Sequence, residues 1–510
     1  MKIAVEGCAH GELDKIYECI ETLQDREGIK IDLLICCGDF QSVRNTEDLR
    51  SMAVPEKYQH MCTFYKYYSG EKRAPLLTIF IGGNHEASNY LQELPYGGWV
   101  APNIYYLGRA GVVKFGNLRI GGISGIYKGH DYLQGLWECP PYSQKSLRSV
   151  YHIRSLDVFR LSQLQDKVHV MLSHDWPRGI TNHGNKDNLL RRKPFLREDI
   201  ESNQLGSVPA EKLLHIIKPE YWFAAHLHCQ FAALVEHEGD KETKFLALDK
   251  CLPKRRHLQI LDLPEEYDGD KLLQFDAEWL AVLKNTNHLL SVKNIDCHMP
   301  GPGGDERYEF TPTAEEKAKI IESVQNLTIT EDMFVRTAPI YNPNAPKKVP
   351  TNPIANPQTV KLCEMLGIDD PIQVIMARSS RVMTQPQADI KSFHDITRSP
   401  ENGSMQSPLR TPIKCTKLSL PAPVTPNEND SFNITSETTI SQSTSFLSET
   451  SNNSIDCETP GSNSTKKTFK RRNLSIYNTP DDESVSTTSS SLADSDSPRS
   501  SKIPYRGTAL

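Results

Sequence analysis

Residues 76–86 read Leu-Leu-Thr-Ile-Phe-Ile-Gly-Gly-Asn-His-Glu. The first six form a mostly apolar run that predicts a buried strand, and the two glycines allow the chain to turn sharply where that strand ends. Asn84, His85 and Glu86 then place an amide, an imidazole and a carboxylate on one loop. Such a loop offers a metal ion one neutral oxygen ligand and sets a proton carrier beside it. Whether it forms a metal site depends on how the other strands end.

The rest of the N-terminal half repeats this strand pattern. Apolar residues at helical spacing over residues 12–25 predict an amphipathic helix between the first two strands, and residues 209–217 predict another. Apolar strands that alternate with helices favour a parallel α/β arrangement. The predicted strands are residues 1–5, 31–37, 76–81, 104–107, 112–115, 118–120, 168–172 and 221–225.

Five of these strands end in side chains that can bind metal ions or carry protons. Because the carboxyl ends of parallel strands gather on one edge of a sheet, we expect these side chains to lie together. A single histidine at a strand end is commonly a hydrogen-bonded structural residue, so the joint pattern carries the prediction. The residues are Cys8, His10, Asp39, Asn84, His85, His174, His226 and His228.

These residue types suit a pair of divalent cations. Asp39 can bridge two cations and compensate their charge, while imidazoles and the Asn84 amide oxygen complete two sites with open positions. Two such cations, about 3.5–4 Å apart, hold a hydroxide and a phosphate for in-line attack. The alternation of an extended loop points His85 away from them, which leaves it free to protonate a leaving oxygen. The alternative role for His85 is a hydrogen bond to a metal ligand.

Two segments interrupt the alternation of strands and helices. Residues 125–165 are rich in aromatic side chains and, like residues 178–199, are more basic than acidic. Aromatic side chains stack on unpaired bases and arginines hold phosphates, so the first segment has the composition of an RNA-binding loop; the alternative is an ordinary surface loop. The run Arg191, Arg192 and Lys193 either holds RNA phosphates or is a solvated run of charge.

Composition limits the class of protein. A chain of 510 residues is too long for one core and predicts two or more domains. A hydrophobic content of 38% predicts that part of it is disordered, and a net charge of −6 excludes general affinity for nucleic acid while permitting local basic patches. The cysteines lack a disulfide-framework spacing and no apolar segment leads the chain, which predicts a reducing compartment. No apolar run is long enough to span a membrane.

The composition changes twice along the chain. Residues 1–235 read as an α/β catalytic domain, and residues 236–375 as a smaller domain with helices at 277–283, 314–324 and 357–366. Residues 376–510 are rich in Ser, Thr and Pro and are expected to be a disordered tail, because they cannot bury enough apolar surface to offset chain entropy. Basic residues within 466–472 resemble a nuclear import signal and predict a nuclear protein. Several Ser-Pro and Thr-Pro pairs are typical of phosphorylation sites; the alternative is a solvating tail.

These motifs resemble a known superfamily. Gly-Asp at 38–39, Gly-Asn-His-Glu at 83–86, the later His174 and His-x-His at 226–228 resemble the calcineurin-like metallophosphoesterases, whose fold is a β-sandwich flanked by helices. Longer stretches resemble one family within it, the RNA lariat debranching enzymes, over residues 1 to about 375. Those stretches are residues 8–14, 36–41, 82–88, 94–99, 121–126, 173–177 and 225–228.

The resemblance implies a reaction and a role for each matching residue. Enzymes of that family hydrolyse the 2′-5′ phosphodiester bond at the branch point of excised intron lariats, which linearises them for turnover after pre-mRNA splicing. It implies His85 as the general acid and residues 128–160 as a lariat recognition loop. It implies one metal site from Cys8, His10, Asp39 and His228, and another from Asp39, Asn84, His174 and His226. The expected RNA contacts are Lys128, Tyr132, Trp137, Tyr142, Arg148 and Arg154, and the tail could bind splicing-associated proteins.

Cys8 departs from the wider superfamily, where most members have Asp at this position. A thiolate is softer than a carboxylate and favours Zn²⁺ or Fe²⁺ over Mg²⁺. We therefore expect one or two ions per chain, drawn from Fe²⁺, Zn²⁺ or Mn²⁺. The alternative is that Cys8 is simply a small buried residue. Arg44, which follows Asp39 closely, is a further candidate for contact with the substrate phosphate. The sequence does not indicate an oligomeric state.

Two other functions compete with debranching. Protein serine/threonine phosphatases share Gly-Asn-His-Glu, but they resemble each other in an Asp-Arg-Gly motif, where this chain has Asp-Phe-Gln at 39–41. They also lack an insertion like residues 128–160. An RNA-binding scaffold with an inactive metal site is the second alternative, and the complete set of ligand residues argues against it.

Overall fold

The computed structural model describes residues 1–304, 307–345 and 350–384. The predicted disordered tail lies outside the described residues from 385 onward, as do its basic motif and its phosphorylation sites. Helix α12 (Pro371–Thr384) continues past residue 376, where the sequence places the start of that tail. Ile372 and Ile375, 2% and 8% exposed, pack with Val292 in a small apolar cluster at the start of this helix, which explains why the chain stays ordered there.

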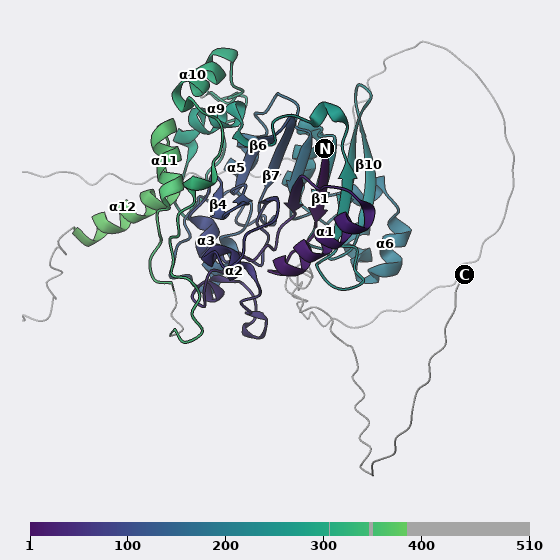
Figure 1. The fold of residues 1–510 in the computed structure, drawn as a ribbon. Helices are drawn as coiled ribbons and strands as arrows, with labels where there is room; N and C mark the ends of the chain where they lie inside the picture. The colour runs from purple at the N-terminus through teal and green to yellow at the C-terminus, as the bar shows by residue number, and fades with distance from the viewer. Residues whose placement is uncertain (305–306, 346–349, 385–510) are drawn as a thin grey trace, which may run out of the picture. The chain divides into compact units, whose positions relative to one another are not determined.

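A six-stranded sheet carries the first part of the predicted strand pattern (Figure 1). Its four inner strands are parallel, and an antiparallel strand borders them on each side. Helix α1 (Leu13–Glu27) connects the first two parallel strands, as the helical spacing predicts. Across the sheet the strands are β12 (Leu258–Asp262), β1 (Lys2–Glu6), β2 (Leu33–Cys36), β3 (Leu77–Phe80), β5 (Ile104–Tyr106) and β4 (Gly98–Ala101).

A seven-stranded sheet carries the remaining predicted strands. Its centre is parallel, and hairpin partners extend it on both sides. Helices flank the two sheets, so the predicted α/β fold of the metallophosphoesterase type is confirmed (Figure 1). Across this sheet the strands are β10 (Phe231–His237), β11 (Lys241–Ala247), β9 (Tyr221–Ala224), β8 (Val170–Ser173), β7 (Leu118–Ile123), β6 (Ala110–Phe115) and β13 (Leu273–Phe275).

The predicted domain boundary between residues 235 and 236 falls inside β10, and the chain that follows it adds strands to both sheets. After it, β11 inserts between β10 and β9, β12 pairs with β1, and β13 pairs with β6. In β11 the buried Thr243 and Phe245 alternate with the exposed Glu242 and Lys244. This period of two is the mark of a half-buried strand. The charged side chains at the outward positions obscure this alternation in the sequence, so only helices were predicted after residue 235.

The helices agree with the spans predicted from sequence at residues 209–217, 277–283, 314–324 and 357–366. The last of these, α11, is fixed to the first sheet: Gln358 accepts from the backbone N–H of Trp99 and donates to its carbonyl, both at 2.9 Å. None of the helices in the described part of the chain combines the length and apolar composition needed to cross a bilayer. The helices are α1 (Leu13–Glu27), α2 (Phe64–Ser69), α3 (Ser88–Gln92), α4 (Gln144–Ser149), α5 (Ser155–Leu161), α6 (Lys186–Arg192), α7 (Arg197–Glu201), α8 (Val208–Ile217), α9 (Ala277–Asn285), α10 (Ala314–Val324), α11 (Pro357–Leu366) and α12.

Candidate metal centre

The predicted ligands follow the carboxyl ends of five parallel strands, β1, β2, β3, β8 and β9, and the structure brings them together. Four of them have backbone φ angles in the left-handed region: His10 at 46°, Asp39 at 45°, His226 at 66° and His228 at 49°. Residues with side chains adopt this region at a cost in energy, and such strain clusters at functional sites. The sharp turns at the strand ends therefore aim these side chains inward, and the surrounding fold holds them there.

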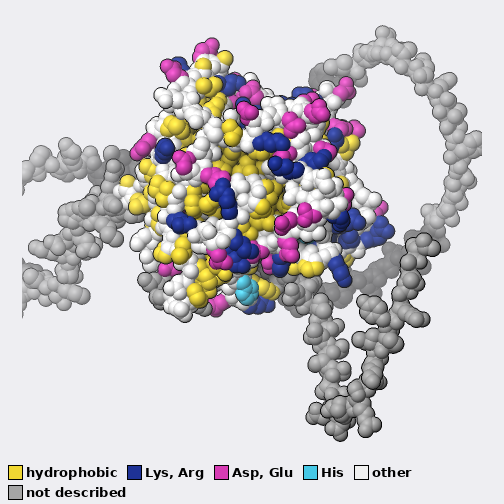
Figure 2. Space-filling model, in the orientation of Figure 1, with side chains coloured by type: hydrophobic (Ala, Val, Ile, Leu, Met, Phe, Trp, Pro, Cys, Tyr) yellow, Lys and Arg dark blue, Asp and Glu magenta, His cyan; other side chains and the backbone are white. Residues whose placement is uncertain are grey.

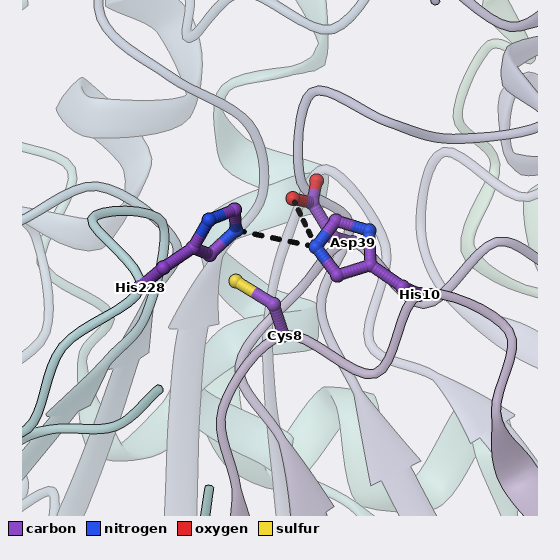
Figure 3. A group of neighbouring side chains, drawn as sticks. All are labelled: Cys8, His10, Asp39 and His228. Atoms are coloured by element: carbon purple, nitrogen blue, oxygen red, sulfur yellow. Dashed lines mark hydrogen bonds and ion pairs between the residues drawn. The ribbon is translucent and has the colours of Figure 1, made fainter. Parts of the chain in front are cut away.

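Cys8, His10, Asp39 and His228 form the first group (Figure 3). One donor atom from each lies within 4.8 Å of all the others. His10 Nε2 is 3.2 Å from His228 Nε2 and 3.8 Å from Asp39 Oδ2, and the Cys8 sulfur points toward the space between the two imidazoles. A sulfur, two nitrogens and an oxygen suit Zn²⁺ or Fe²⁺. These residues fit a divalent cation.

The second group contains Asn84, His174 and the other oxygen of Asp39. His174 Nδ1 lies 2.8 Å from the Cys37 carbonyl, to which it donates its proton. This hydrogen bond directs His174 Nε2 toward Asn84 Oδ1 at 3.2 Å and Asp39 Oδ1 at 3.3 Å. Three polar atoms thus converge, and these residues would hold a divalent cation if one were bound among them. The His226 ring lies 4.9 Å from the His174 ring and completes the set.

Asp39 is the residue that the two groups share. It is 1% exposed, and its two oxygens face opposite groups. Burial alone raises the pKa of a carboxyl, but the His174, His85 and His10 imidazoles hold the pKa of Asp39 well below its usual value. Gly83 is required beside it, because a Cβ there would lie 2.2 Å from Asp39 Oδ1. The carboxylate is therefore ionised and turns one oxygen toward each of the two groups.

The other ligands are prepared in different protonation states. Burial lowers the pKa of His10 to about 3 and that of His226 well below its usual value, so both imidazoles are neutral, as metal ligands must be. Burial and the charge of Asp39 raise the pKa of the Cys8 thiol well above its usual value. The backbone N–H of His226 donates to the Cys8 sulfur at 3.2 Å. The Cys8 sulfur thus lies within the group of side chains that could hold a metal ion.

Glu86 supports the centre by accepting hydrogen bonds from the backbone of two of its loops. Its Oε1 accepts the backbone N–H groups of Phe40 and Gly83, both at 2.8 Å, and its Oε2 accepts that of Gln41 at 2.9 Å. The carboxylate therefore ties the loop after β2 to the loop after β3. Gln41, which the sequence analysis does not single out, lies with its Nε2 3.1 Å from His10 Nδ1 and orients that ring.

His85 lies at the mouth of the centre. Its side chain is partly exposed, whereas those of Asn84 and Glu86 are buried. Its ring centre is 5.6 Å from that of His10, and its backbone N–H donates to Asp39 Oδ1 at 2.9 Å. The backbone is thus fixed to the shared carboxylate while the imidazole borders solvent. This placement suits a proton donor to a group that enters from outside.

Five of the six predicted RNA contacts have side chains that are exposed or partly exposed in the loop over residues 128–160. Arg148 is exposed on α4, while burial lowers the pKa of Lys128 to about 8. The Trp137 indole donates to Gln134 at 3.1 Å, and the Tyr142 hydroxyl donates to Gln92 at 2.6 Å. Tyr132 packs edge-on against Tyr127, with ring centres 5.6 Å apart.

The structure corrects the sixth predicted RNA contact, Arg154, because its side chain is buried. It is 1% exposed, and its guanidinium donates to the Glu138 carboxylate and to the carbonyls of Asp131 at 2.8 Å and Ser149 at 3.1 Å. A buried charge must be paired, so this arginine holds the loop together and does not face RNA.

The structure also corrects the prediction that Arg44 contacts the substrate phosphate. Arg44 is 1% exposed and donates to Asp48 at 2.9 Å, to Glu93 at 2.8 Å and to Thr337 at 2.9 Å. It joins the loop after β2 to the C-terminal part of the chain and is not available to a substrate phosphate.

A cavity of about 60 Å³ adjoins the metal centre. Gly83 and Glu86 line it from the loop after β3, Glu138 and Tyr151 from the loop over residues 128–160, and Ile372 from α12. The loop after β3, the loop over residues 128–160 and α12 therefore meet at this cavity.

Comparison with known proteins agrees with this geometry. Residues 1–230 match the model of the calcineurin-like phosphoesterases, and residues 240–371 match that of the lariat debranching enzyme C-terminal domain. The chain is 51% identical over 474 residues to the lariat debranching enzyme of Drosophila pseudoobscura pseudoobscura, covering 83% of this chain and 87% of that relative. The chain belongs to the lariat debranching enzyme family.

Lariat debranching enzymes of other organisms are also similar to this chain. The human lariat debranching enzyme is 52% identical over 378 residues, covering 72% of this chain and 70% of the relative, and that of Drosophila melanogaster is 47% identical over 545 residues, covering 94% and 100%. Calcineurin-like phosphoesterases are hydrolases that use divalent metal ions, and membership in this family agrees with the donor atoms of the metal centre.

Proposed function

We propose that this chain hydrolyses the 2′-5′ phosphodiester bond at the branch point of excised intron lariats. The observation that carries the proposal is the convergence of Cys8, His10, Asp39 and His228 in a chain of this family. Cys8 stands where most metallophosphoesterases have Asp, and the loop over residues 128–160 gives this centre a partly aromatic and basic neighbour.

The reaction divides among the chain's own residues. When bound, divalent ions supply an activated water and neutralise the phosphate. Asp39 holds its two oxygens toward both groups of ligands, and Glu86 keeps the two supporting loops at a fixed separation. His85, at the mouth of the centre, donates a proton to the departing 2′ oxygen, which would otherwise leave as an unstable alkoxide.

The Cys8 sulfur bears on which ion is used. We infer that Fe²⁺, Zn²⁺ or Mn²⁺ supports activity, with one or two ions per chain, because a thiolate ligand disfavours Mg²⁺. Protein purified without oxygen and analysed for metals, then depleted by a chelator, is expected to lose activity and to regain it with one of these ions. Recovery by Mg²⁺ alone would contradict the role of Cys8.

The branch itself is held by the loop over residues 128–160. Tyr132, Trp137 and Tyr142 provide aromatic surface for unpaired bases, while Lys128 and Arg148 provide positive charge for phosphates. Burial lowers the pKa of Lys128 to about 8, so its ammonium is still mostly charged at pH 7 and can pair with a phosphate.

Debranching is tested with a synthetic RNA that contains one 2′-5′ branch among 3′-5′ linkages. We expect the purified chain to release the branch and to leave the 3′-5′ bonds intact, and a chelator to stop the reaction. The control substrate is a phosphopeptide. Release of phosphate from it, with no cleavage of the branched RNA, would assign the chain to the protein phosphatases instead.

Nuclear location and a role for the tail in binding splicing-associated proteins follow from the same function, because excised lariats arise where splicing occurs. A fluorescent fusion of the full chain is expected to concentrate in the nucleus. Replacement of Lys466, Lys467, Lys470, Arg471 and Arg472 by Gln is expected to disperse it. An unchanged distribution would remove these residues from the proposal.

A further inference from the structure

Two runs of basic side chains lie close to the metal centre. The first, Arg191, Arg192 and Lys193, ends α6 and leads into the short helix η4 (Pro194–Leu196). The second, residues 254–256, reads Lys-Arg-Arg and forms part of the turn between β11 and β12. All six side chains are exposed except that of Lys193, which is partly buried. We refer to these six residues together with Phe195 as the basic surface.

Both runs contact the same residue beside the centre. Arg192 Nη2 donates to the backbone carbonyl of Gln230 at 2.7 Å, and Arg256 Nη1 donates to the Gln230 side-chain oxygen at 2.9 Å. Gln230 follows the metal-centre residue His228 by two positions. Segments that are more than sixty residues apart in sequence therefore converge on the loop that delivers a ligand.

The second run is also attached to the segment that carries Cys8. Lys250 forms a parallel bridge with Cys8, and the backbone N–H of Cys251 donates to the Cys8 carbonyl at 3.0 Å. On the other side of the turn, the His257 carbonyl accepts the backbone N–H of Gly7 at 2.9 Å. The turn with its three cations is thus fixed at both ends to the strand that leads into the metal centre.

Phe195 gives the surface a second feature. Its side chain is 61% exposed, and Lys193 Nζ lies 5.7 Å from its ring centre. Basic side chains gather over α6 in Figure 2. Arg255 pairs with Asp249 at 3.3 Å, which offsets part of its charge. A solvated run of charge would account for the cations, but not for their convergence beside His228 or for a large exposed aromatic ring among them.

We propose that the basic surface binds the phosphate backbone of a single-stranded RNA arm as that arm leaves the metal centre, with Phe195 stacking on one base. Grooves that track single strands combine cations with exposed aromatic rings in this way. The inference rests on the proposed function, because it assumes that a branched RNA occupies the centre. It assigns an arm of that RNA to a surface separate from the loop over residues 128–160.

The first experiment compares two RNAs with the same branch. One has arms of a single nucleotide, and in the other each arm has about ten nucleotides, enough to cover a single-strand track. In the variant R191Q/R192Q/K193Q, we expect KM for the long-armed RNA to rise roughly ten-fold or more with kcat unchanged, because backbone contacts add affinity at a distance from the reaction. Both constants for the short-armed RNA are expected to stay as in the wild type.

A matched variant controls for net charge. K284Q/R307Q/K319Q also removes three exposed cations, from α9, α10 and the segment before α10. It is expected to leave both RNAs unaffected. An equal rise in KM in this control, or a fall in kcat on the short-armed RNA in the first variant, would overturn the proposal.

The second experiment measures binding of an unbranched single strand and needs no cleavage. The slope of log affinity against log salt is expected to fall by about 2 in R191Q/R192Q/K193Q, since each phosphate contact on a single strand contributes about 0.7. Phe195→Ala is expected to weaken binding roughly ten-fold with the slope unchanged. An unchanged slope would overturn the basic surface while debranching stands. Failure of the wild type to cleave either branched RNA would overturn debranching, and the slope would still decide the surface.

Discussion

The metal centre takes its side chains from strand ends, whereas the loop over residues 128–160 takes its shape from buried polar contacts. In the centre, the ordered ends of five strands deliver each ligand, and glycines such as Gly83 make room for the shared carboxylate. In the loop, Arg154 pairs with Glu138, and His152 with Asp131, away from solvent. Asp39 and the histidines of the centre are grouped for chemistry, whereas Arg154 and Glu138 hold the shape of the loop. Substitutions can test this division.

The largest effect is expected at the carboxylate that both groups of ligands share. Asp39→Asn removes the charge that lies 3.3 Å from His174 and 3.8 Å from His10. We expect cleavage of the branched RNA to fall more than about 10⁴-fold, beyond the usual loss from removing an acid or base alone. Metal analysis of the same protein is expected to show reduced metal content. Full metal content with full activity would show that the centre does not depend on Asp39.

The next effect is expected at His85. His85→Ala removes the proposed proton donor, so cleavage is expected to fall on the order of 10²–10⁴-fold. Because the ligand set is intact, metal content is expected to equal that of the wild type. The exposed His60 provides a matched control, and His60→Ala is expected to change neither quantity. Loss of metal from His85→Ala would make this residue a support for the ligands instead of an acid.

In the loop, substitutions of the buried Arg154 and the exposed Arg148 are expected to differ in their effect on the free energy of unfolding. Arg154→Met leaves the buried Glu138, 2% exposed, without its positively charged partner, so urea unfolding is expected to show a loss of about 3–5 kcal/mol. Arg148→Met, on the exposed face of α4, is expected to change stability by less than about 0.5 kcal/mol. It is expected to raise KM for branched RNA instead. Equal stabilities for the two variants would remove the structural role of Arg154.

The same division explains what the sequence could predict. The ends of the strands can be predicted from the sequence, because apolar runs and the polar residues after them follow the regular geometry of a parallel sheet. The sequence therefore placed all seven predicted ligands and His85 in one region. The position of a side chain in an irregular loop depends on contacts far along the chain. Arg44 and Arg154 look like any other arginine near a site, and only the carboxylates of Glu93 and Glu138, distant in sequence, show that both are buried.

The missed strands have a related cause. β11 carries its charges on the outward positions of a half-buried strand, and its neighbour β9 lies on the other side of β10 in sequence. Its alternation over residues 241–247 was available in the sequence and is typical of a half-buried strand. The contact of Gln41 with His10 carried no comparable signal, because a glutamine after a strand has many uses.

The smallest effect is expected in the pH dependence of stability, through the buried His152 of the loop. Burial lowers the pKa of His152 to about 4, and the positive charges of Arg154 and Lys128 lower it further. Asp131, which accepts a hydrogen bond from His152 Nδ1 at 2.7 Å, offsets part of this shift. In the unfolded chain this histidine titrates near 6.5, so stability is full above that pH and falls as the pH drops from about 6.5 toward 4. Between pH 7 and pH 5, the wild type is expected to lose about 2 kcal/mol through this residue.

His152→Gln removes this contribution without adding a charge. Urea unfolding of the variant is expected to show a pH dependence smaller by that amount, with a lower stability at pH 7 because the hydrogen bond to Asp131 is altered. His60→Ala again serves as the control and is expected to keep the pH dependence of the wild type. Identical pH profiles for the wild type and His152→Gln would mean that the loop accepts a charged histidine, and that its buried polar contacts do not set its shape as the structure implies.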